Sequence, residues 1–387
     1  MNVRLGCERL FDDACVAHVR HRRVGLVTNH SGVDGRLRAT ADRLHTADDV
    51  DLALLFGPEH GIRGDAEDGV TVDTGIDAHT GVPAISLYGD RRQPSVEELA
   101  DLDVLLFDIQ DVGVRFYTYL YTMSLSMVAC AEAGVPIVVL DRPNPVGGVE
   151  VEGNILDPAF ASFVGLYPIP VRYGLTVGEL ARLFNEEFGI GADLHVIDML
   201  GWHRNMSWQD TGLPWVAPSP NMPTQDTASV YPGMCFFEGT NISEGRGTTR
   251  PFEQVGAPYI DGFALADELN GLRLPGALFR PVFFRPAFAK YEGQSCAGVQ
   301  LHVTDHARLQ PVRVGFEAIA AVRRAWPDQF AWRTNREGIH NFDKLAGSDG
   351  VRLAIDAGTS IEDLLRDWAK ERIGFEELRQ KYLHYPL

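Results

Sequence analysis

The chain has 387 residues, 45% of them hydrophobic, which is enough for two hydrophobic cores because single cores rarely grow beyond about 250 to 300 residues. Its 35 basic and 53 acidic side chains give a formal net charge of −18, and without a basic run to neutralise phosphates the sequence argues against a nucleic-acid partner. None of the lysines follows a glycine, which excludes the phosphate-binding loop of P-loop NTPases.

The chain carries no signal that places it outside the cytoplasm. Its five cysteines are far apart and include no Cys-x-x-Cys pair, so we expect buried free thiols. The N-terminus, MNVRLGCERLFDD, lacks the apolar region and cleavage site of a secretory signal. The longest apolar stretch, residues 118–140, is interrupted by Glu132, Gly134 and Pro136 and is typical of a helix followed by a strand. We therefore expect a cytoplasmic protein without a membrane partner.

The first half of the chain alternates short β-branched runs with amphipathic stretches, a pattern typical of a parallel sheet covered by helices. Strands are expected at residues 24–28, 52–56, 104–108, 136–140 and 194–197. Helices are expected at residues 36–48, 117–133 and 177–188, the last of them after a capping box formed by Thr176 and Glu179. The pattern predicts a Rossmann-like, doubly wound α/β fold with a mainly parallel sheet.

The second half begins with a segment, residues 214–258, that has no periodicity and is rich in Pro, Gly, Asn and Thr. Irregular segments of this length are usually functional or disordered, and the aromatic content here argues against disorder. Helices at residues 263–270 and 312–326 and strands at 279–285 and 298–303 then predict a smaller α+β domain. We expect one domain at residues 1–254 and the other at 255–387.

Polar side chains follow four of the expected strands, where open α/β sheets bind their ligands. They include Asn29, His30 and Ser31, Glu59 and His60, Asp108, Gln110, Asp111, Arg115 and Tyr117, and Asp141, Arg142 and Asn144. Because these strand ends meet at one edge of the sheet, we expect one shared site.

Glu59 is the strongest catalytic candidate in this group. It stands in the segment FGPEHGIRG, where Pro58 precedes it and glycines flank it, which predicts a tight turn that projects the carboxyl group from a strand end. A carboxyl group partly removed from water by Phe56 and Ile62 is suited to general acid catalysis. The alternative is a loop glutamate that caps the next segment or pairs with Arg63.

Metal binding is a second interpretation of the same strand ends. His30 and His60 belong to no cluster with metal-ligand spacing, so hydrogen-bonding roles are favoured for them. Asp108 and Asp111 are both suited to a cation, but Asp108 is equally suited to capping the sheet end and orienting Arg115.

The irregular segment contains a second cluster of charged residues, namely Glu238, Glu244, Arg246, Arg250 and Glu253. Glycosidases generally use two carboxyl groups across the scissile bond, and this segment is a source of the partner to Glu59. An arginine here is suited to clamping a substrate carboxylate. The alternative is an internal salt-bridge cluster that rigidifies a long loop. The Gly-x-Ser-x-Gly elbow of α/β-hydrolases and a Gly-x-Gly-x-x-Gly after the first strand are both absent.

Seven segments in order resemble the NamZ-type exo-β-N-acetylmuramidases, glycoside hydrolases of peptidoglycan turnover, over nearly the whole chain. They are GLVTNHSGVD (25–34), LFGPEHGIRG (55–64), LLFDIQDVGVRFYTYLYTM (105–123), LDRPNPVGG (140–148), PIPVRYGLTVGELA (168–181), PSPNMPT (218–224) and FEGTNISEGRGTTRPFE (237–253).

This resemblance implies an enzyme that removes β-1,4-linked N-acetylmuramic acid (MurNAc) from the non-reducing end of cell-wall glycan fragments, without a cofactor. It also implies that the active site lies in a cleft between the two domains and that the family's catalytic glutamate is Glu59. We infer in addition that Arg246 or Arg250 binds the lactyl carboxylate of MurNAc. Many relatives carry an export signal that this chain lacks, which favours the recycling of imported fragments.

The expected partner is a small glycan, MurNAc-GlcNAc (GlcNAc, N-acetylglucosamine) or a longer peptidoglycan fragment, with no metal ion. The catalytic candidates are Glu59, His60, Asp108 and Glu244. The candidate substrate-binding residues all lie in the matching segments and are Asn29, His30, Arg63, Gln110, Arg115, Tyr117, Arg172, Tyr173, Asn221, Thr240, Asn241, Arg246, Arg250 and Glu253. Two other functions stay open, a metal-dependent hydrolase and a muramyl-sugar-binding protein without catalysis.

Overall fold

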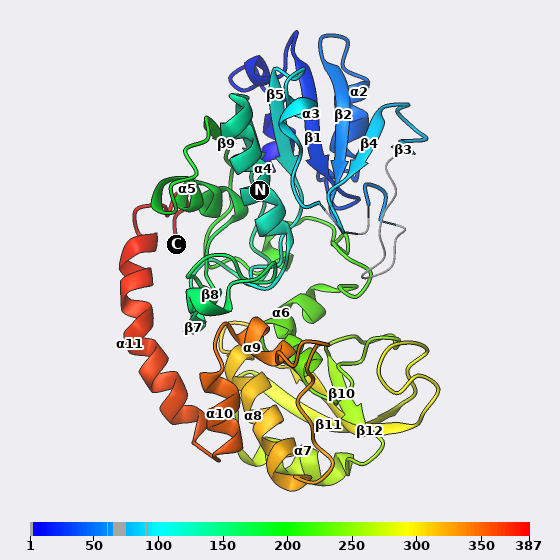
Figure 1. The fold of residues 1–387 in the computed structure, drawn as a ribbon, viewed down its shortest axis with the longest axis vertical. Coiled ribbons are helices and arrows are strands. Elements are labelled where there is room, and N and C mark those ends of the chain that lie inside the picture. The colour runs from blue at the N-terminus through cyan, green and yellow to red at the C-terminus, as the bar shows by residue number, and fades with distance from the viewer. Residues whose placement is uncertain (1–2, 60, 65–74, 90) are drawn as a thin grey trace.

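A computed structural model of the chain describes residues 3–59, 61–64, 75–89 and 91–387. Figure 1 shows two bodies stacked along the long axis of the molecule, the upper one built from the N-terminal half of the chain and the lower one from residues that follow it. Helix α11 (Ile361–Arg379) runs along one side from the lower body back to the upper one. In the described part of the chain, no helix is long and apolar enough to cross a membrane.

The upper body contains a seven-stranded sheet. Its strands, in spatial order, are β3 (Gly75–Ile76), β4 (Pro83–Ser86), β2 (Asp51–Gly57), β1 (Arg23–Thr28), β5 (Val104–Asp108), β6 (Ile137–Leu140) and β9 (Leu194–Ile197). All neighbours pair in parallel except β3 with β4. Without that edge strand the chain order across the sheet is 3-2-1-4-5-6, the order of Rossmann-type doubly wound folds. The predicted Rossmann-like fold is confirmed.

The strand order of this sheet reverses between β1 and β5, which is where such folds bind their ligands. The two strands pair from Val24 with Val104 to Thr28 with Asp108, so their carboxyl ends lie level. Both are almost completely buried, as expected for strands covered by helices on both faces. The register therefore brings the polar residues after β1 and β5 to the same edge of the sheet.

Three helices of the upper body lie where the sequence pattern predicted them: α2 (Thr40–His45), which is shorter than expected, α4 (Tyr119–Ala133) and α5 (Val177–Glu187). Elements that the pattern did not predict are α1 (Gly6–Arg9), α3 (Val96–Leu99) and the short 3₁₀ turns η1 (Val16–His18), η2 (Pro158–Phe160) and η3 (Gln209–Thr211). The capping box before α5 is confirmed, because the Glu179 amide donates to Thr176 Oγ1 at 3.2 Å and the Thr176 amide donates to Glu179 Oε2 at 3.0 Å. A small two-stranded sheet, β7 (Glu152–Ile155) with β8 (Pro170–Arg172), lies below them.

The lower body is a smaller α+β unit, as predicted. Its antiparallel sheet has the order β10 (Gln254–Ala257), β12 (Cys296–Val303), β11 (Ala277–Phe284). The helices around it are α6 (Gln225–Met234), α7 (Gly262–Gly271), α8 (Pro311–Ala325), α9 (Asn341–Ala346) and α10 (Gly350–Asp356). The expected domain boundary near residue 255 stays a prediction, since the sheet begins at Gln254 but α6 already packs against α8.

The expectation of an irregular segment over residues 214–258 is wrong in part. The segment contains α6, the 3₁₀ turn η4 (Cys235–Gly239) and β10. Helix α6 carries Pro232 inside it and is buried on most of its surface, so its sequence shows no amphipathic period. It approaches α8 so closely that a Cβ atom on Gly233 or Gly315 would clash with the backbone of the other helix.

The end of the chain joins the lower body to the upper one. After α11, the Tyr385 hydroxyl donates to Asp141 Oδ2 at 2.5 Å, just beyond the carboxyl end of β6. The Arg204 amide donates to the Pro386 carbonyl at 2.8 Å. These contacts tie the segment after α11 to the upper body and so connect the two bodies.

Candidate functional site

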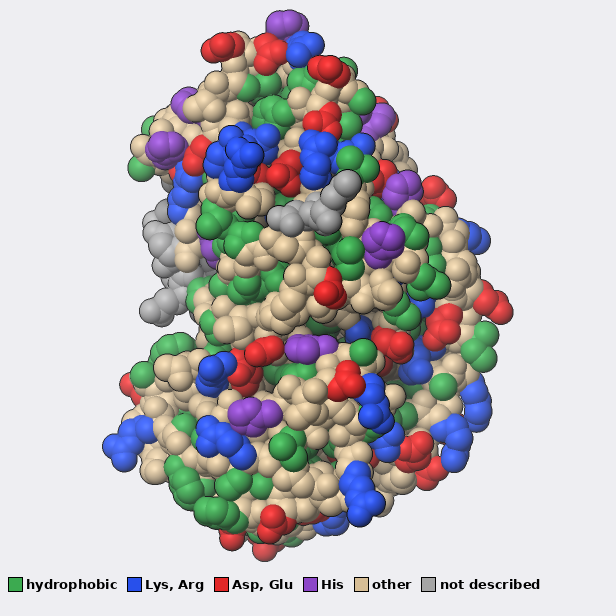
Figure 2. Space-filling view, turned by 180° about the vertical axis from the view of Figure 1, so that it is seen from behind, with side chains coloured by type: hydrophobic (Ala, Val, Ile, Leu, Met, Phe, Trp, Pro, Cys, Tyr) green, Lys and Arg blue, Asp and Glu red, His purple; other side chains and the backbone are tan. Residues whose placement is uncertain are grey.

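A cleft lies between the two bodies and consists of two adjoining cavities of about 500 and 950 Å³. The two cavities share five lining residues: Val164, Asn221, Glu238, Arg246 and Lys344. Glu59 lines the smaller cavity, whereas Glu244 lines the larger one. Figure 2, a view from behind, shows the surface indented between the two bodies at its left edge.

Glu59 projects into the smaller cavity from the turn that follows β2. The Gly61 amide donates to the Pro58 carbonyl at 3.0 Å, and Gly61 has a φ of 72°, a conformation that favours glycine. This is the tight turn that the sequence predicted. Burial and the neighbouring Glu59 carboxylate, to which the phenol is hydrogen-bonded, raise the pKa of Tyr88 to about 12.

Aromatic side chains form the rest of this wall. Tyr117 and Tyr119 follow β5, are almost fully buried and contact each other edge to face at 4.9 Å between ring centroids. The Tyr119 hydroxyl donates to the Pro218 carbonyl at 2.8 Å, which ties this wall to the segment that leads into the lower body. Tyr117 lies in the cleft, so the structure brings this predicted residue together with Glu59.

The opposite wall comes from the lower body and is built from two ion pairs. Glu238 Oε1 accepts from Arg246 Nε at 3.1 Å and from Arg246 Nη2 at 2.8 Å. Glu244 Oε2 lies 2.8 Å from Lys290 Nζ, and that ammonium group also donates to the carbonyls of Phe237 and Ile242. The irregular segment therefore does supply carboxyl groups to the cleft, and it supplies them already paired with cations.

Like charges and burial shift the pKa values of this wall. Burial, the neighbouring Glu244 and then Glu59 raise the pKa of Glu238 well above that of an ordinary glutamate. Burial lowers the pKa of Lys290, and it lowers the pKa of Arg246 to about 10 although Glu59 acts in the opposite direction. The cleft thus holds a second carboxyl group that retains its proton more readily than an exposed one.

Asp108 and Arg115 are placed away from the cleft. Asp108 is fully buried below the strand ends, where its carboxylate accepts from Arg142 at 2.6 and 2.9 Å and from Thr40 Oγ1 at 2.6 Å. Arg115 is also fully buried and donates to the carbonyls of four residues: Asn154, Ile169, Leu345 and Ala346. Neither side chain lines the cleft, and Arg115 instead connects the upper body to helix α9.

The polar residues after β1 and β5 shape the site from beneath. Asn29 Oδ1 accepts from the Ser31 amide at 2.9 Å, and Asn29 Nδ2 donates to the Pro218 carbonyl at 3.2 Å. His30 Nε2 lies 2.6 Å from the Ala217 carbonyl, and Gln110 Nε2 donates to the Asp111 and Pro143 carbonyls. Asn29 and His30 hold the loop before α6 against the sheet, whereas Gln110 links the segments that follow β5 and β6.

Seven further candidates lie outside the cleft and have partners within the protein. Arg63 pairs with Asp77 and Asp42, Arg172 pairs with Glu152, and the Tyr173 hydroxyl donates to Asp111; Thr240 and Asn241 bond to backbone groups, and Arg250 pairs with Glu253, itself a candidate. His60 lies outside the described residues. Of the predicted set, the structure brings Glu59, Tyr117, Asn221, Glu244 and Arg246 together in the cleft.

Sequence reasoning missed several residues that line the cleft, among them Tyr88, Arg92, Phe163, Lys290 and Lys344. Tyr88 follows the short strand β4, which has no clear pattern, and the lysines come from loops and helices far along the chain. One signal was present, because two of only four lysines in the chain lie here.

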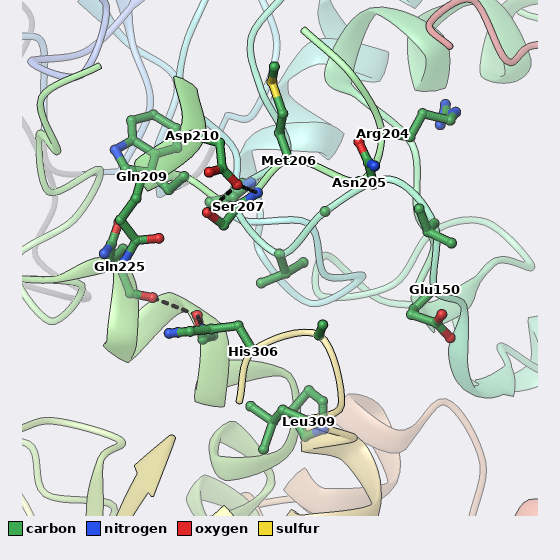
Figure 3. Close-up of a pocket in the computed structure, with 18 of the residues that line it drawn as sticks. Glu150, Arg204, Asn205, Met206, Ser207, Gln209, Asp210, Gln225, His306 and Leu309 are labelled. Carbon is green, nitrogen blue, oxygen red and sulfur yellow. Dashed lines mark hydrogen bonds between the residues drawn. The ribbon is translucent and has the colours of Figure 1, made fainter. Parts of the chain in front are cut away.

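A third cavity, of about 690 Å³, is separate from the cleft, and the two have no described lining residue in common. Figure 3 shows it, with Arg204, Asn205 and Asp210 on one side and His306 with Leu309 on the other. Among the described residues, no group of three or more His, Cys, Asp or Glu side chains is placed to hold a metal ion.

Comparisons with known proteins agree over the whole chain. The sequence models of the N-terminal and C-terminal parts of "Exo-beta-N-acetylmuramidase NamZ" match residues 24–226 and 229–385. A relative in Bacillus subtilis (strain 168), peptidoglycan beta-N-acetylmuramidase NamZ, is 49% identical over 383 residues, or 99% of this chain and 91% of the relative.

Two solved structures of DUF1343 family proteins from Bacteroides fragilis have the same fold. One has a TM-score of 0.91 at 39% identity over 99% of each chain. The other has a TM-score of 0.80 at 31% identity over 100% of this chain and 99% of its own. The chain therefore belongs to the family of NamZ exo-β-N-acetylmuramidases.

Proposed function

We propose that this protein is an exo-acting glycoside hydrolase that releases β-1,4-linked MurNAc from the non-reducing end of peptidoglycan fragments. The observation that carries the proposal is the pair of carboxyl groups, Glu59 and Glu238, that line one cavity from opposite domains. Family membership and the name of the Bacillus subtilis relative support the choice of substrate.

Glu59 is the proposed general acid, which donates a proton to the glycosidic oxygen as the bond to the anomeric carbon breaks. Burial and the neighbouring carboxylates of Glu244 and Glu59 disfavour ionisation of Glu238. Glu238 therefore keeps its proton to a higher pH than an exposed glutamate would. The Glu244 carboxylate, on the same wall of the cleft, stabilises the oxocarbenium-like transition state.

A substitution at Glu59 tests this function. Glu59→Gln keeps the size of the side chain but removes the acidic proton, so we expect kcat on MurNAc-GlcNAc, whose sugar leaving group needs that proton, to fall by at least about 100-fold, the lower end for general acid catalysis. Glu97→Gln, an exposed glutamate on α3, is the matched control and should leave kcat unchanged. Near-normal turnover by Glu59→Gln would refute the assignment.

Two other functions give different results with the wild-type protein. A metal-dependent hydrolase loses activity on chelation and regains it with a divalent ion. A sugar-binding protein shows heat of binding with MurNAc-GlcNAc in calorimetry but forms no product.

A further inference from the structure

The cleft is more basic than the protein around it. Among the described residues, the two cavities are lined by five cations, Arg92, Arg246, Lys290, Arg333 and Lys344, against the three carboxyl groups of Glu59, Glu238 and Glu244. The whole chain carries a formal net charge of −18. A local excess of cations in such a chain favours an anionic ligand over a neutral one.

MurNAc is such a ligand, and the proposed function fixes where its charge must lie. It differs from GlcNAc by a lactyl ether on O3, which ends in a carboxylate. Only one ring carbon separates C3 from the anomeric carbon, where Glu59 acts. A side chain that binds the lactyl carboxylate must therefore line the same cavity as Glu59.

In the part of the chain that the structure describes, three cations line that cavity, and two of them have other contacts. Arg246 donates twice to Glu238 and lies 3.7 Å from Glu244. Arg92 is exposed, and its guanidinium group stacks on the Phe163 ring at 3.9 Å from the centroid. Both arginines are therefore engaged before any substrate arrives.

Lys344 is the third cation, and it differs from the other two. It lies where the two cavities meet and is only partly exposed. None of the described residues forms an ion pair or a side-chain hydrogen bond with it. A partly buried ammonium group without such a partner has lost part of its hydration without gaining an anion. A substrate carboxylate would compensate for this lost hydration.

The backbone that carries Lys344 is held in place from both sides. Arg352 makes two hydrogen bonds of 2.8 Å to the neighbouring Asp343, and Arg115 donates to the Leu345 and Ala346 carbonyls at 3.2 and 2.7 Å. Helix α9 is thus fixed against both bodies, and the ammonium group is presented to the cleft from a rigid support.

We propose that Lys344 binds the lactyl carboxylate of the terminal MurNAc and thereby makes the enzyme prefer MurNAc to GlcNAc. The inference rests on the function proposed above. It replaces the expectation that Arg246 or Arg250 has this task, since Arg246 is paired with Glu238 and Arg250 lies outside the cleft, paired with Glu253.

The test compares 4-nitrophenyl β-glycosides of MurNAc and GlcNAc on the full-length protein. Lys344→Met should lower kcat/KM for the muramide by about 10- to 100-fold, the range for one charge-assisted hydrogen bond, and leave that for the glucosaminide unchanged. Lys344→Arg should retain most of the preference. Lys370→Met, at an exposed lysine on α11, is the matched control, and thermal unfolding verifies that each variant is folded.

Two results would overturn the inference while leaving the proposed function intact: an unchanged preference in Lys344→Met, or loss of the preference in Arg92→Met instead. If the wild type cleaves neither glycoside, the proposed function fails. Calorimetry with free MurNAc and free GlcNAc then tests the inference separately. Lys344→Met must weaken the binding of MurNAc and leave the binding of GlcNAc unchanged.

Discussion

Arg115 offers the most direct test of a structural assignment that differs from the sequence-based one. The sequence predicted contact with substrate, whereas the structure shows a fully buried guanidinium group that donates to four backbone carbonyls. In Arg115→Met these oxygens lose that donor. The Ala346 carbonyl still accepts from Asn154 Nδ2 at 2.8 Å, and the Ile169 carbonyl still accepts from the Leu156 amide at 3.3 Å.

The two other carbonyls bear most of the loss, at about 1 to 3 kcal/mol for each buried acceptor left unsatisfied. We therefore expect Arg115→Met to lower the free energy of unfolding by about 3 kcal/mol, measured by urea denaturation with tryptophan fluorescence. Arg366→Met, at an exposed arginine on α11, should stay within about 0.5 kcal/mol of the wild type. An unchanged urea midpoint together with a raised KM would show that Arg115 binds substrate and would refute this reasoning.

Further predictions concern the acid, the metal alternative and the end of the chain. As the pH rises through the raised pKa of Glu238, that carboxyl group loses its proton and adds a negative charge beside Glu244; Glu238→Gln cannot titrate and should therefore remove the alkaline step that this ionisation produces in the kcat/KM profile. Dialysis against EDTA should leave turnover of the muramide unchanged, and a loss that a divalent ion restores would favour the metal-dependent alternative. Tyr385→Phe removes the bond to Asp141 and the acceptor of the Met199 amide, so thermal unfolding should show a loss of about 1 to 3 kcal/mol.

The central sheet could be predicted from the sequence because its strands are short, β-branched and buried on both faces. The expected strand over residues 104–108 coincides with β5, and that over 194–197 coincides with β9. Edge strand β3 is two exposed residues long, and helix α6 is buried on most sides, so neither has a periodicity to detect. Tertiary packing, rather than local pattern, determines these elements.

The candidate site was predictable where function depends on a single turn, as at Glu59, and less so where it depends on contacts between domains. The partner of Glu59 was expected at Glu244, and only the fold shows that Glu238 lines the same cavity while Glu244 is paired with Lys290. A polar residue after a strand is equally suited to binding a ligand or to fixing a loop. Asp108 shows this, because its salt bridge with Arg142 lies beneath the site.

The products formed from MurNAc-GlcNAc show whether the protein hydrolyses this glycosidic bond and whether Glu59 is needed for it. Mass spectrometry of the wild-type reaction should show free MurNAc and free GlcNAc, and the same reaction with Glu59→Gln should show the intact disaccharide over the same time. Turnover in both proteins would contradict the role of Glu59, and an intact disaccharide with the wild type would contradict the proposed hydrolysis itself.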